Sequence, residues 1–183
     1  MTEKQKMLSG KLYNSLDSEL VGLRQKARLL LEEFNNSSVL DNKKRLLIIK
    51  KLFAKIGSKI HIEPPFYCDY GFNIEFGNDV YLNYNCIFLD VCKITVGSNV
   101  LFAPGVQVLT ASHPLDSETR INGLEYGKPV SIGDNCWIGA GAIILPGVTI
   151  GINTVIGAGS VVTKDIPDNT LAVGNPCKLI KNL

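Results

Sequence analysis

Residues 132–162 have the sequence IGDNCWIGAGAIILPGVTIGINTVIGAGSVV, in which every sixth residue is a branched aliphatic. These residues form what we call the aliphatic ladder: Ile132, Ile138, Ile144, Ile150, Ile156 and Val162. Four positions after each comes a small or aliphatic residue: Cys136, Ala142, Val148, Thr154, Ser160 and Ile166. A six-residue period fits neither an amphipathic helix nor an alternating strand, but it is typical of a solenoid of short strands and tight turns. The sequence therefore predicts a mainly β fold, a parallel β-helix of hexapeptide repeats.

The hexapeptide rhythm is interrupted once. Between Val108 and Ile132 lies a polar stretch, residues 112–129, that is rich in Pro and Gly and has no hexapeptide character. Since Val108 and Ile132 are 24 residues apart, a multiple of six, the rhythm resumes in phase. We therefore expect one protruding loop over about residues 112–130, and excursions from a rigid scaffold often carry function.

Toward the N-terminus the rhythm is less regular and starts at Ile60. It shifts by two residues at Phe76 and again at Val96, which predicts bulges or longer corners. Large residues crowd this part, where side chains that leave the ladder can face a partner or substrate: Tyr67, Tyr70, Phe72, Tyr81 and Tyr84.

The first 59 residues have helical spacing instead. One apolar stripe consists of Leu20, Leu23, Ala27, Leu30, Leu31 and Phe34. Asp17 or Ser18 can cap the start of this helix, and polar residues 35–38 end it. A second stripe, stopped by Gly57, consists of Leu46, Ile49, Leu52 or Phe53, and Ile56. We predict an N-terminal helical hairpin (1–59) packed on a β-helix domain (60–183), the two forming one structural unit.

Composition narrows the class of protein. The chain has 183 residues, of which 45% are hydrophobic, and this is enough for one domain with a sizeable core. No run approaches the about 20 apolar residues of a membrane span, and the N-terminal apolar run is too short for a signal peptide. We therefore expect a cytoplasmic protein without a membrane partner. Five cysteines without a CxxC pair argue against a disulfide framework and a zinc site, and Cys86 and Cys136 fall at small inward positions.

Charge is unevenly distributed. The net charge is only +2, but residues 1–60 carry 13 basic and 6 acidic side chains. Such a surplus can bind nucleic acid, yet Lys43-Lys44-Arg45 and Lys50-Lys51 lack interleaved aromatic residues. Charge alternating with an apolar stripe is typical of solvated helix faces, so we expect no nucleic-acid partner.

The chain has two histidines, His61 and His113. His113 lies where the solenoid gives way to the loop, and a neutral imidazole there could accept a proton from a substrate. A loop histidine that makes one hydrogen bond is the simpler interpretation of His113 by itself. His61 is predicted to be a surface residue.

An ordered set of motifs resembles the maltose and galactoside O-acetyltransferases, a group that includes the nodulation acetyltransferases. The motifs are Asn83-Tyr84-Asn85-Cys86, Leu89-Asp90-Val91-Cys92, Ala103-Pro104-Gly105-Val106, His113-Pro114-Leu115-Asp116, Gly127-Lys128-Pro129-Val130, Trp137-Ile138-Gly139, residues 145–151, residues 162–167 and Gly174-Asn175-Pro176. The resemblance covers residues 7–181, and residues 67–71 and 89–92 lean toward the maltose branch. It implies a left-handed β-helix with three hexapeptides per turn.

The resemblance also implies an activity. His113 would be the general base that deprotonates a sugar hydroxyl, which then attacks the thioester of acetyl-CoA directly, without a covalent enzyme intermediate. Backbone N–H donors near Ala140 would hold the oxyanion, and the base would return its proton to the departing thiolate. Acetyl-CoA is thus the expected co-substrate, and no metal is expected.

Family positions that bind the acceptor match Asp17, Arg24, Asp69, Tyr81 and Asn83 here, and Glu125 in the loop could also reach the sugar or orient His113. Simpler roles stay open, because Asp17 can cap a helix, Arg24 can face water and Asn83 can form a turn. Positions that line the CoA channel in the family match Trp137, Gly139, Ala140, Gly141, Ala158, Thr163, Lys164, Lys178 and Lys181. Gly139 is also explained by turn geometry, and Trp137 by packing on a neighbouring chain.

Family members are homotrimers with active sites between adjacent solenoids, and the loop after His113 would reach across. Serine, an amino sugar or an antibiotic remains open as the acceptor, and so does a non-enzymatic scaffold. The γ-type carbonic anhydrases share this kind of solenoid but need three histidines for zinc, so a chain with two is excluded.

Overall fold

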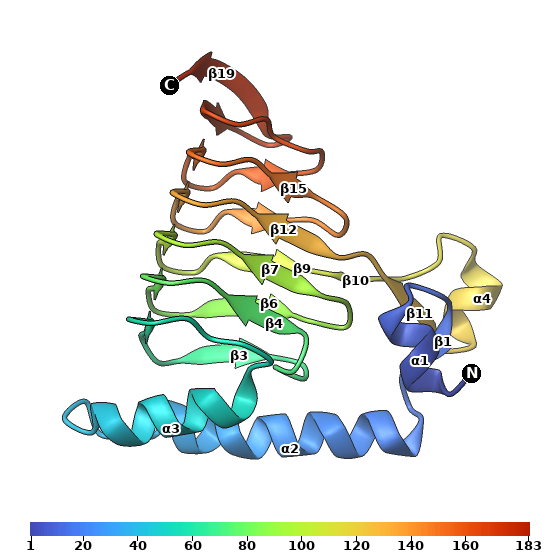
Figure 1. Cartoon of the computed structure of the whole chain (residues 1–183). Coiled ribbons are helices and arrows are strands. Elements are labelled where there is room, and N and C mark those ends of the chain that lie inside the picture. The colour runs from blue at the N-terminus through green and yellow to red at the C-terminus, as the bar shows by residue number, and fades with distance from the viewer.

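A computed structural model describes residues 1–183 (Figure 1). Each turn of the solenoid consists of three short strands separated by three corners. The first face contains β2 (His61–Ile62), β5 (Tyr81–Leu82), β8 (Leu101–Phe102), β13 (Trp137–Ile138), β16 (Val155–Ile156) and β18 (Thr170–Val173). The second contains β3 (Phe66–Cys68), β6 (Cys86–Leu89), β9 (Gln107–Leu109), β14 (Ile143–Ile144) and β17 (Val161–Val162). The third contains β4 (Ile74–Phe76), β7 (Ile94–Val96), β12 (Val130–Ile132) and β15 (Thr149–Ile150). All these strands pair in parallel, which confirms the predicted β-helix, and only β19 (Lys178–Asn182) folds back antiparallel on β18.

The aliphatic ladder fills the interior as predicted. Every ladder residue is 2% exposed or less, and Ile138 pairs in register with Phe102 below and Ile156 above. The small residues four positions later are also buried, including Cys136 and Ser160. Each buried branched side chain contributes about 1.5–3 kcal/mol relative to an exposed one, so the stack stabilises the rod along its whole length.

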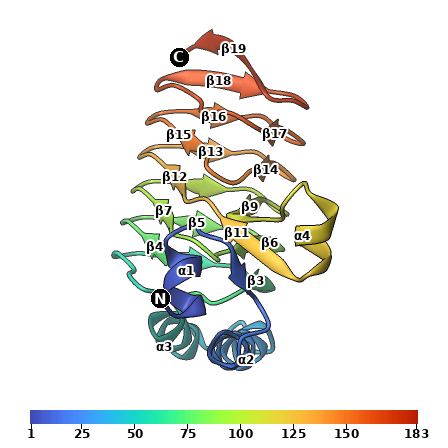
Figure 2. The same cartoon turned by 90° about the vertical axis from the view of Figure 1, so that its right-hand side faces the viewer.

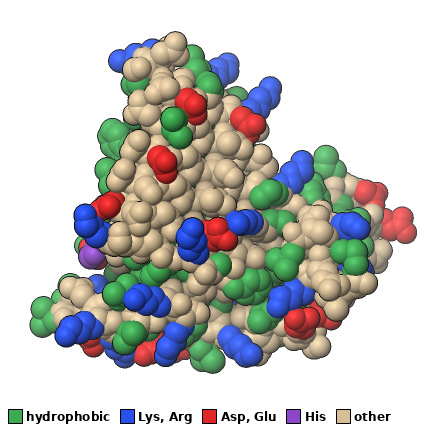
Figure 3. All heavy atoms as spheres, viewed as in Figure 1, with side chains coloured by type: hydrophobic (Ala, Val, Ile, Leu, Met, Phe, Trp, Pro, Cys, Tyr) green, Lys and Arg blue, Asp and Glu red, His purple; other side chains and the backbone are tan.

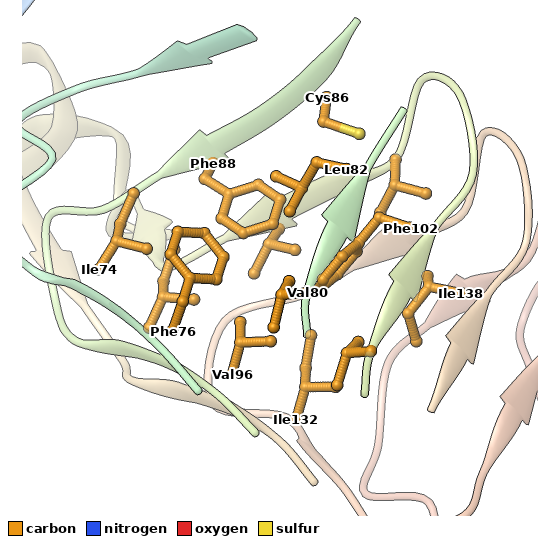
Figure 4. Close-up of a cluster of buried hydrophobic side chains, with 14 of the residues drawn as sticks. Ile74, Phe76, Val80, Leu82, Cys86, Phe88, Val96, Phe102, Ile132 and Ile138 are labelled. Carbon is orange, nitrogen blue, oxygen red and sulfur yellow. The ribbon is translucent and has the colours of Figure 1, made fainter. Parts of the chain in front are cut away.

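The lower turns are wider than the upper ones. Ile62 pairs with Leu82 and Leu82 with Phe102, so these turns have 20 residues, whereas the turn from Ile138 to Ile156 has 18. The extra residues form longer corners between the second and third faces, with no break in strand register, and this accounts for the two-residue shifts. Aromatic rings fill the wider interior, among them Phe76, Phe88 and Phe102 (Figure 4).

The N-terminal segment closes the base of the solenoid with α2 (Ser18–Asn35) and α3 (Asn42–Leu52), as predicted for a helical hairpin (Figures 1 and 2). The predicted extent of the second helix is wrong, because α3 ends at Leu52 and leaves Ile56 outside. Phe53 departs from the helix to pack edge-to-face against Phe66 and Phe76, and Lys55 then forms a parallel β-bridge with Glu75 of the third face. The apolar stripe also differs, since Ile48 is buried and Leu46 is exposed.

One hydrophobic cluster of 34 buried residues runs from Ala27 in α2 to Ala172 in β18. The hairpin and the solenoid therefore share a core. The lysines of α3 lie on the outside of the base, where the space-filling view shows basic side chains along the helices (Figure 3). None of the helices is both long enough and apolar enough to cross a membrane.

The interruption of the ladder is a protruding loop, as predicted, and it has its own structure. It contains β10 (Ala111–Ser112), α4 (Ser117–Ile121) and β11 (Leu124–Gly127). β11 pairs antiparallel with β10 and also with β1 (Tyr13–Asn14), which follows α1 (Glu3–Leu8). The N-terminal segment and the loop thus form a small sheet beside the solenoid (Figure 2).

Candidate active site

We call the corner between the second and third faces the second corner, and a polar cavity of about 180 Å³ lies there beside the small sheet. It is lined by Tyr13, Ser15, Arg24, Arg28, Asp69, Tyr70, Val91 and Glu125. The structure therefore brings together three of the predicted acceptor residues, Arg24, Asp69 and Glu125. They come from α2, the corner after β3, and β11, so only the tertiary fold assembles them.

Hydrogen bonds fix most of the polar walls of this cavity. The hydroxyl of Tyr13 donates to Glu125 Oε2 at 2.9 Å. Arg24 donates to the hydroxyl of Tyr70 and to the carbonyl of Ser15, both at 2.6 Å. In contrast, the carboxylate of Asp69 accepts no hydrogen bond within the chain and is free for a ligand.

Burial affects the ionisation of the cavity walls. Desolvation raises the pKa of Asp69, and the guanidinium groups of Arg24 and Arg28 oppose that shift. Desolvation also raises the pKa of Tyr13, and the neighbouring carboxylate of Glu125 adds to the effect. Tyr13 is therefore a neutral hydrogen-bond donor at physiological pH.

His113 immediately follows β10, at the edge of the same small sheet. Ser112 of β10 pairs with Tyr126 of β11, and the two strands are antiparallel. His113, one residue after Ser112, therefore lies opposite Glu125, one residue before Tyr126. The imidazole is exposed and makes no hydrogen bond within the chain. Both ring nitrogens are thus available to a substrate.

Asp17 lies outside the cavity lining. It is the N-cap of α2, and its carboxylate accepts from the backbone N–H of Glu19 at 3.1 Å. The helix-cap role that the sequence left open is therefore present in the structure.

The first corner joins the first and second faces and holds another group of predicted residues. Asn83 is stacked below a column of small, mostly exposed residues: Ala103, Gly105, Gly139, Ala140, Gly141, Ala158 and Gly159. Gly141 has φ +65°, and a Cβ there would meet nothing within 4 Å, so the surface is open. A Cβ on Gly139 would lie 2.5 Å from the backbone nitrogen of Ala158, so close stacking of turns explains that glycine.

Tyr81 and Trp137 lie on the outer surface of the first face. The ring of Tyr81 stacks on His61, with centroids 5.5 Å apart. Leu101, 51% exposed, pairs in register with both Tyr81 below it and Trp137, 53% exposed, above it. The outer surface of the third face is polar by comparison, with Glu75, Thr95, Ser131 and Thr149 in the same positions.

The remaining predicted residues lie near the C-terminal end. Thr163 and Lys164 are exposed at the second corner, two turns above the loop. Lys178 and Lys181 are exposed on β19 above the first face.

Within one chain, therefore, the residues predicted around His113 do not meet those predicted around Ala140. Strand β6 alone, which separates the two corners, spans about 10 Å at about 3.3 Å per residue. His113 and the cavity lie at the second corner, whereas Asn83 and Ala140 lie at the first. No cluster of three or more His, Cys, Asp or Glu side chains that could hold a metal ion occurs in the structure.

Sequence reasoning missed several residues of the cavity wall: Tyr13, Ser15 and Arg28. No periodicity marks them, because they enter the site through a two-residue strand and one turn of α2. Tyr70 had a signal, since it is one of the large residues that crowd the lower turns outside the ladder.

Comparisons with known proteins agree with this architecture. A maltose acetyltransferase hexapeptide capping motif matches residues 6–57, and a hexapeptide repeat of succinyl-transferase matches residues 129–164. A putative acetyltransferase of Dictyostelium discoideum is 52% identical over 183 residues, which cover 100% of this chain and 95% of the relative.

Two solved structures are also very similar. A maltose O-acetyltransferase from Clostridium difficile 630 is 56% identical with a TM-score of 0.99, and the match covers 100% of this chain and 98% of that one. A galactoside acetyltransferase solved in complex with coenzyme A is 43% identical with a TM-score of 0.96, and the match covers 100% and 91%. The chain therefore belongs to the maltose and galactoside O-acetyltransferase family of hexapeptide-repeat acetyltransferases.

Proposed function

We propose that this protein is an O-acetyltransferase that transfers the acetyl group of acetyl-CoA to a hydroxyl of a small sugar resembling maltose, glucose or a galactoside. One observation carries the proposal: the cavity that collects Arg24, Asp69 and Glu125 lies beside the free imidazole of His113. Five free cysteines suit work in the reducing cytoplasm.

The cavity has the chemistry of a site for a neutral polyhydroxyl acceptor. Its walls carry two guanidinium groups and two carboxylates, so donors and acceptors are both present and their charges balance. The free carboxylate of Asp69 and the side chain of Arg28 remain available for hydroxyl groups, which both donate and accept.

His113 acts as the general base. A ring nitrogen takes the proton of the acceptor hydroxyl while its oxygen attacks the thioester carbonyl carbon. The tetrahedral intermediate then collapses, the carbon–sulfur bond breaks, and the imidazolium returns the proton to the thiolate of CoA. The products are the acetyl ester and free CoA thiol, with no covalent enzyme intermediate.

We propose that the complete site forms between two chains of a homotrimer. The first corner would bring Asn83 and the backbone N–H donors near Ala140 to the second corner of a neighbour. Both surfaces have apolar side chains to bury, since Leu101 and Trp137 are half exposed on the first face and Leu115 is 94% exposed in the loop. The polar third face would remain in solvent. A cyclic arrangement joins two such different surfaces in a closed ring.

Acetyl-CoA would lie along the first corner, where small side chains let an extended pantetheine arm approach the backbone. The galactoside acetyltransferase solved in complex with coenzyme A supports acetyl-CoA as the co-substrate. Trp137 would border the channel, and Thr163 and Lys164 would reach it from the second corner of the neighbouring chain. Thr163 would line the channel, and the ammonium groups of Lys164, Lys178 and Lys181 would meet the phosphates.

A thiol-release assay with acetyl-CoA tests the proposal. The acceptors are maltose, glucose, galactosides, chitin fragments, serine and an aminoglycoside. We expect a sugar to stimulate release most, and His113→Ala to lower turnover by about 10²–10⁴-fold with the fold unchanged, as for other general bases. His61→Ala is the matched control and should retain turnover.

Other outcomes favour the alternatives. If serine or an amino group were the best acceptor, the sugar assignment would be wrong. Binding of acetyl-CoA without thiol release to any acceptor would favour a scaffold. Full activity of His113→Ala would remove the proposed base.

A further inference from the structure

Asp90 is a fully buried carboxylate directly behind the acceptor cavity. It is 0% exposed, and it does not line the cavity. Its Oδ1 accepts from the backbone N–H groups of Asp69 at 3.0 Å and Tyr70 at 2.8 Å. Its Oδ2 accepts from the backbone N–H of Asn73 at 3.3 Å. One side chain therefore satisfies three backbone donors of a corner that has no regular secondary structure.

The side chain of Asn73 forms further hydrogen bonds between the same two turns. Its buried amide donates to the carbonyls of Asp90 at 2.6 Å and Val91 at 3.4 Å. In the same corner, Gly71 has φ +77° and packs so closely on Leu52 that no Cβ would fit. Residues 69–73 are thus bent sharply and are held by hydrogen bonds to the next turn of the solenoid and by contact with Leu52 of α3.

The two residues held most closely are the ones that face the ligand. Asp69 presents the free carboxylate of the cavity, and the hydroxyl of Tyr70 holds the guanidinium of Arg24. We infer that Asp90 is a positioning residue of the acceptor site, which places the Asp69 carboxylate and the Tyr70 ring through their backbone. This inference rests on the proposed function, because it assumes that the cavity binds the acceptor.

Other carboxylates of the solenoid show what is particular to Asp90. Asp134, Asp165 and Asp168 also accept a backbone N–H from the adjacent turn, but each accepts only one and each is exposed. Burial raises the pKa of Asp90 to about 7, and the charge of Asp69 adds to this, whereas backbone hydrogen bonds oppose it. Burial raises the pKa of the neighbouring Cys68 thiol, and the charge of Asp90 adds to that shift. Asp90 therefore takes up a proton as the pH falls through neutrality, and a protonated carboxyl group offers fewer hydrogen-bond acceptors than a carboxylate.

Kinetics of Asp90→Ala and Asp90→Asn test the inference. The alanine variant loses all three hydrogen bonds, and we expect its KM for the sugar to rise about tenfold or more, while its KM for acetyl-CoA stays within about twofold. The asparagine variant keeps an oxygen for Asp69 and Tyr70, and its effect should be smaller. Asp168→Asn, which alters an exposed cap far from the cavity, is the matched control and should change neither constant.

The pH profile gives a readout that a general loss of stability would not move. In the wild type, protonation of Asp90 removes an acceptor, so the sugar KM should rise as the pH falls from about 8 to 6 at saturating acetyl-CoA. In Asp90→Asn this rise should become smaller, and what remains of it comes from protonation of the Asp69 carboxylate, whose pKa desolvation also raises.

The possible failures are distinguishable. A wild-type enzyme that acetylates no sugar contradicts the proposed function. A wild-type enzyme that acetylates sugar, with an unchanged sugar KM in folded Asp90→Ala, overturns the role of Asp90. If that variant does not fold, an unaltered pH profile in Asp90→Asn overturns it equally.

Discussion

The second corner and the third corner, which joins the third face to the first, belong to the same turns but are built differently. The third corner repeats one device, a residue with φ between 52° and 59°: Lys59, Asp79, Asn99, Asn135, Asn153 and Asn169. Asparagine and aspartate tolerate this left-handed conformation better than most residues. The second corner differs at almost every turn, and between β9 and β12 it holds the whole protruding loop.

Hydrogen-bond partners explain why the third corner is uniform and the second corner is free to vary. At the third corner each turn bonds the next, as in the amide pairs of Asn99 with Asn135 and Asn153 with Asn169, both at 2.9 Å. An insertion there would break bonds on two sides. At the second corner the loop bonds to β1 of the N-terminal segment instead, so it can leave the solenoid without orphaned backbone groups. The variable corner is the one that holds the cavity.

Mixing two inactive variants gives the largest expected effect and tests whether the first and second corners act in different chains. His113→Ala damages the second corner, and Ala140→Trp would fill the proposed CoA groove at the first. If each site uses the two corners of two neighbours, a mixed trimer has one intact site. With random equal mixing, about three quarters of trimers are mixed, so about a quarter of wild-type activity should return.

Subunit exchange must be verified in this experiment, for example by co-purification of two different tags. Each variant mixed with wild type serves as the control for dilution. No recovery in verified mixed assemblies would mean that both corners of one chain serve the same site.

A pair of glycine substitutions should separate stability from binding. A Cβ on Gly97 at the third corner would overlap the Asp134 carboxylate and lie 2.7 Å from the backbone nitrogen of that residue. Gly97→Ala should therefore lower the free energy of unfolding by about 3 kcal/mol, with little effect on the KM for acetyl-CoA. Gly141→Ala meets open space at φ +65°, so it should cost only about 1 kcal/mol but raise that KM, because the methyl group enters the groove.

Denaturant unfolding at matched protein concentration and steady-state kinetics measure the two effects. Gly123→Ala, in the loop at φ +76° with open space around it, is the control for backbone strain alone. Equal losses of unfolding free energy in Gly97→Ala and Gly141→Ala would show that the third and first corners are equally constrained.

The uniform parts of the molecule were the ones that could be predicted from the sequence. A six-residue period is local, so it predicted the ladder from Ile132 to Val162 and the position of the loop. The end of α3 was misplaced because the edge-to-face packing of Phe53 against Phe66 and Phe76 is a tertiary contact. Helical spacing alone carries no sign of those rings.

The cavity was only partly predictable for the same reason. Tyr13 and Glu125 are 112 positions apart and meet through a two-residue strand, which leaves no pattern in the sequence. Arg24, Asp69 and Glu125 were placed in one site by family resemblance, and the structure gathers them in one cavity. Asp90 lies within the motif Leu89-Asp90-Val91-Cys92, but its three backbone hydrogen-bond partners follow from the depth of the corner and not from the motif.

The smallest expected effect concerns the one turn of the third corner where a backbone N–H lacks a side-chain acceptor from the turn above. The backbone N–H of Ser98 donates to Asp134 one turn above at 2.6 Å, and that of Ile152 donates to Asp168 at 2.8 Å. The N–H of Asp134 has no such acceptor, because the residue above it is Ile152, which is 47% exposed. Ile152→Asn supplies the missing oxygen and should raise the free energy of unfolding by about 0.5–1.5 kcal/mol. Ile152→Asp should gain less, since Asp134 and Asp168 place like charges on both sides.

Ile152→Ala removes the exposed side chain without adding an acceptor, and it separates the two contributions in the same unfolding experiment. A gain in the asparagine variant alone would mean that the stability of this corner is a sum of turn-to-turn bonds, of which the natural chain leaves one unmade. An equal gain in the alanine variant would mean that the exposed isoleucine itself, and not the missing bond, weakens the turn.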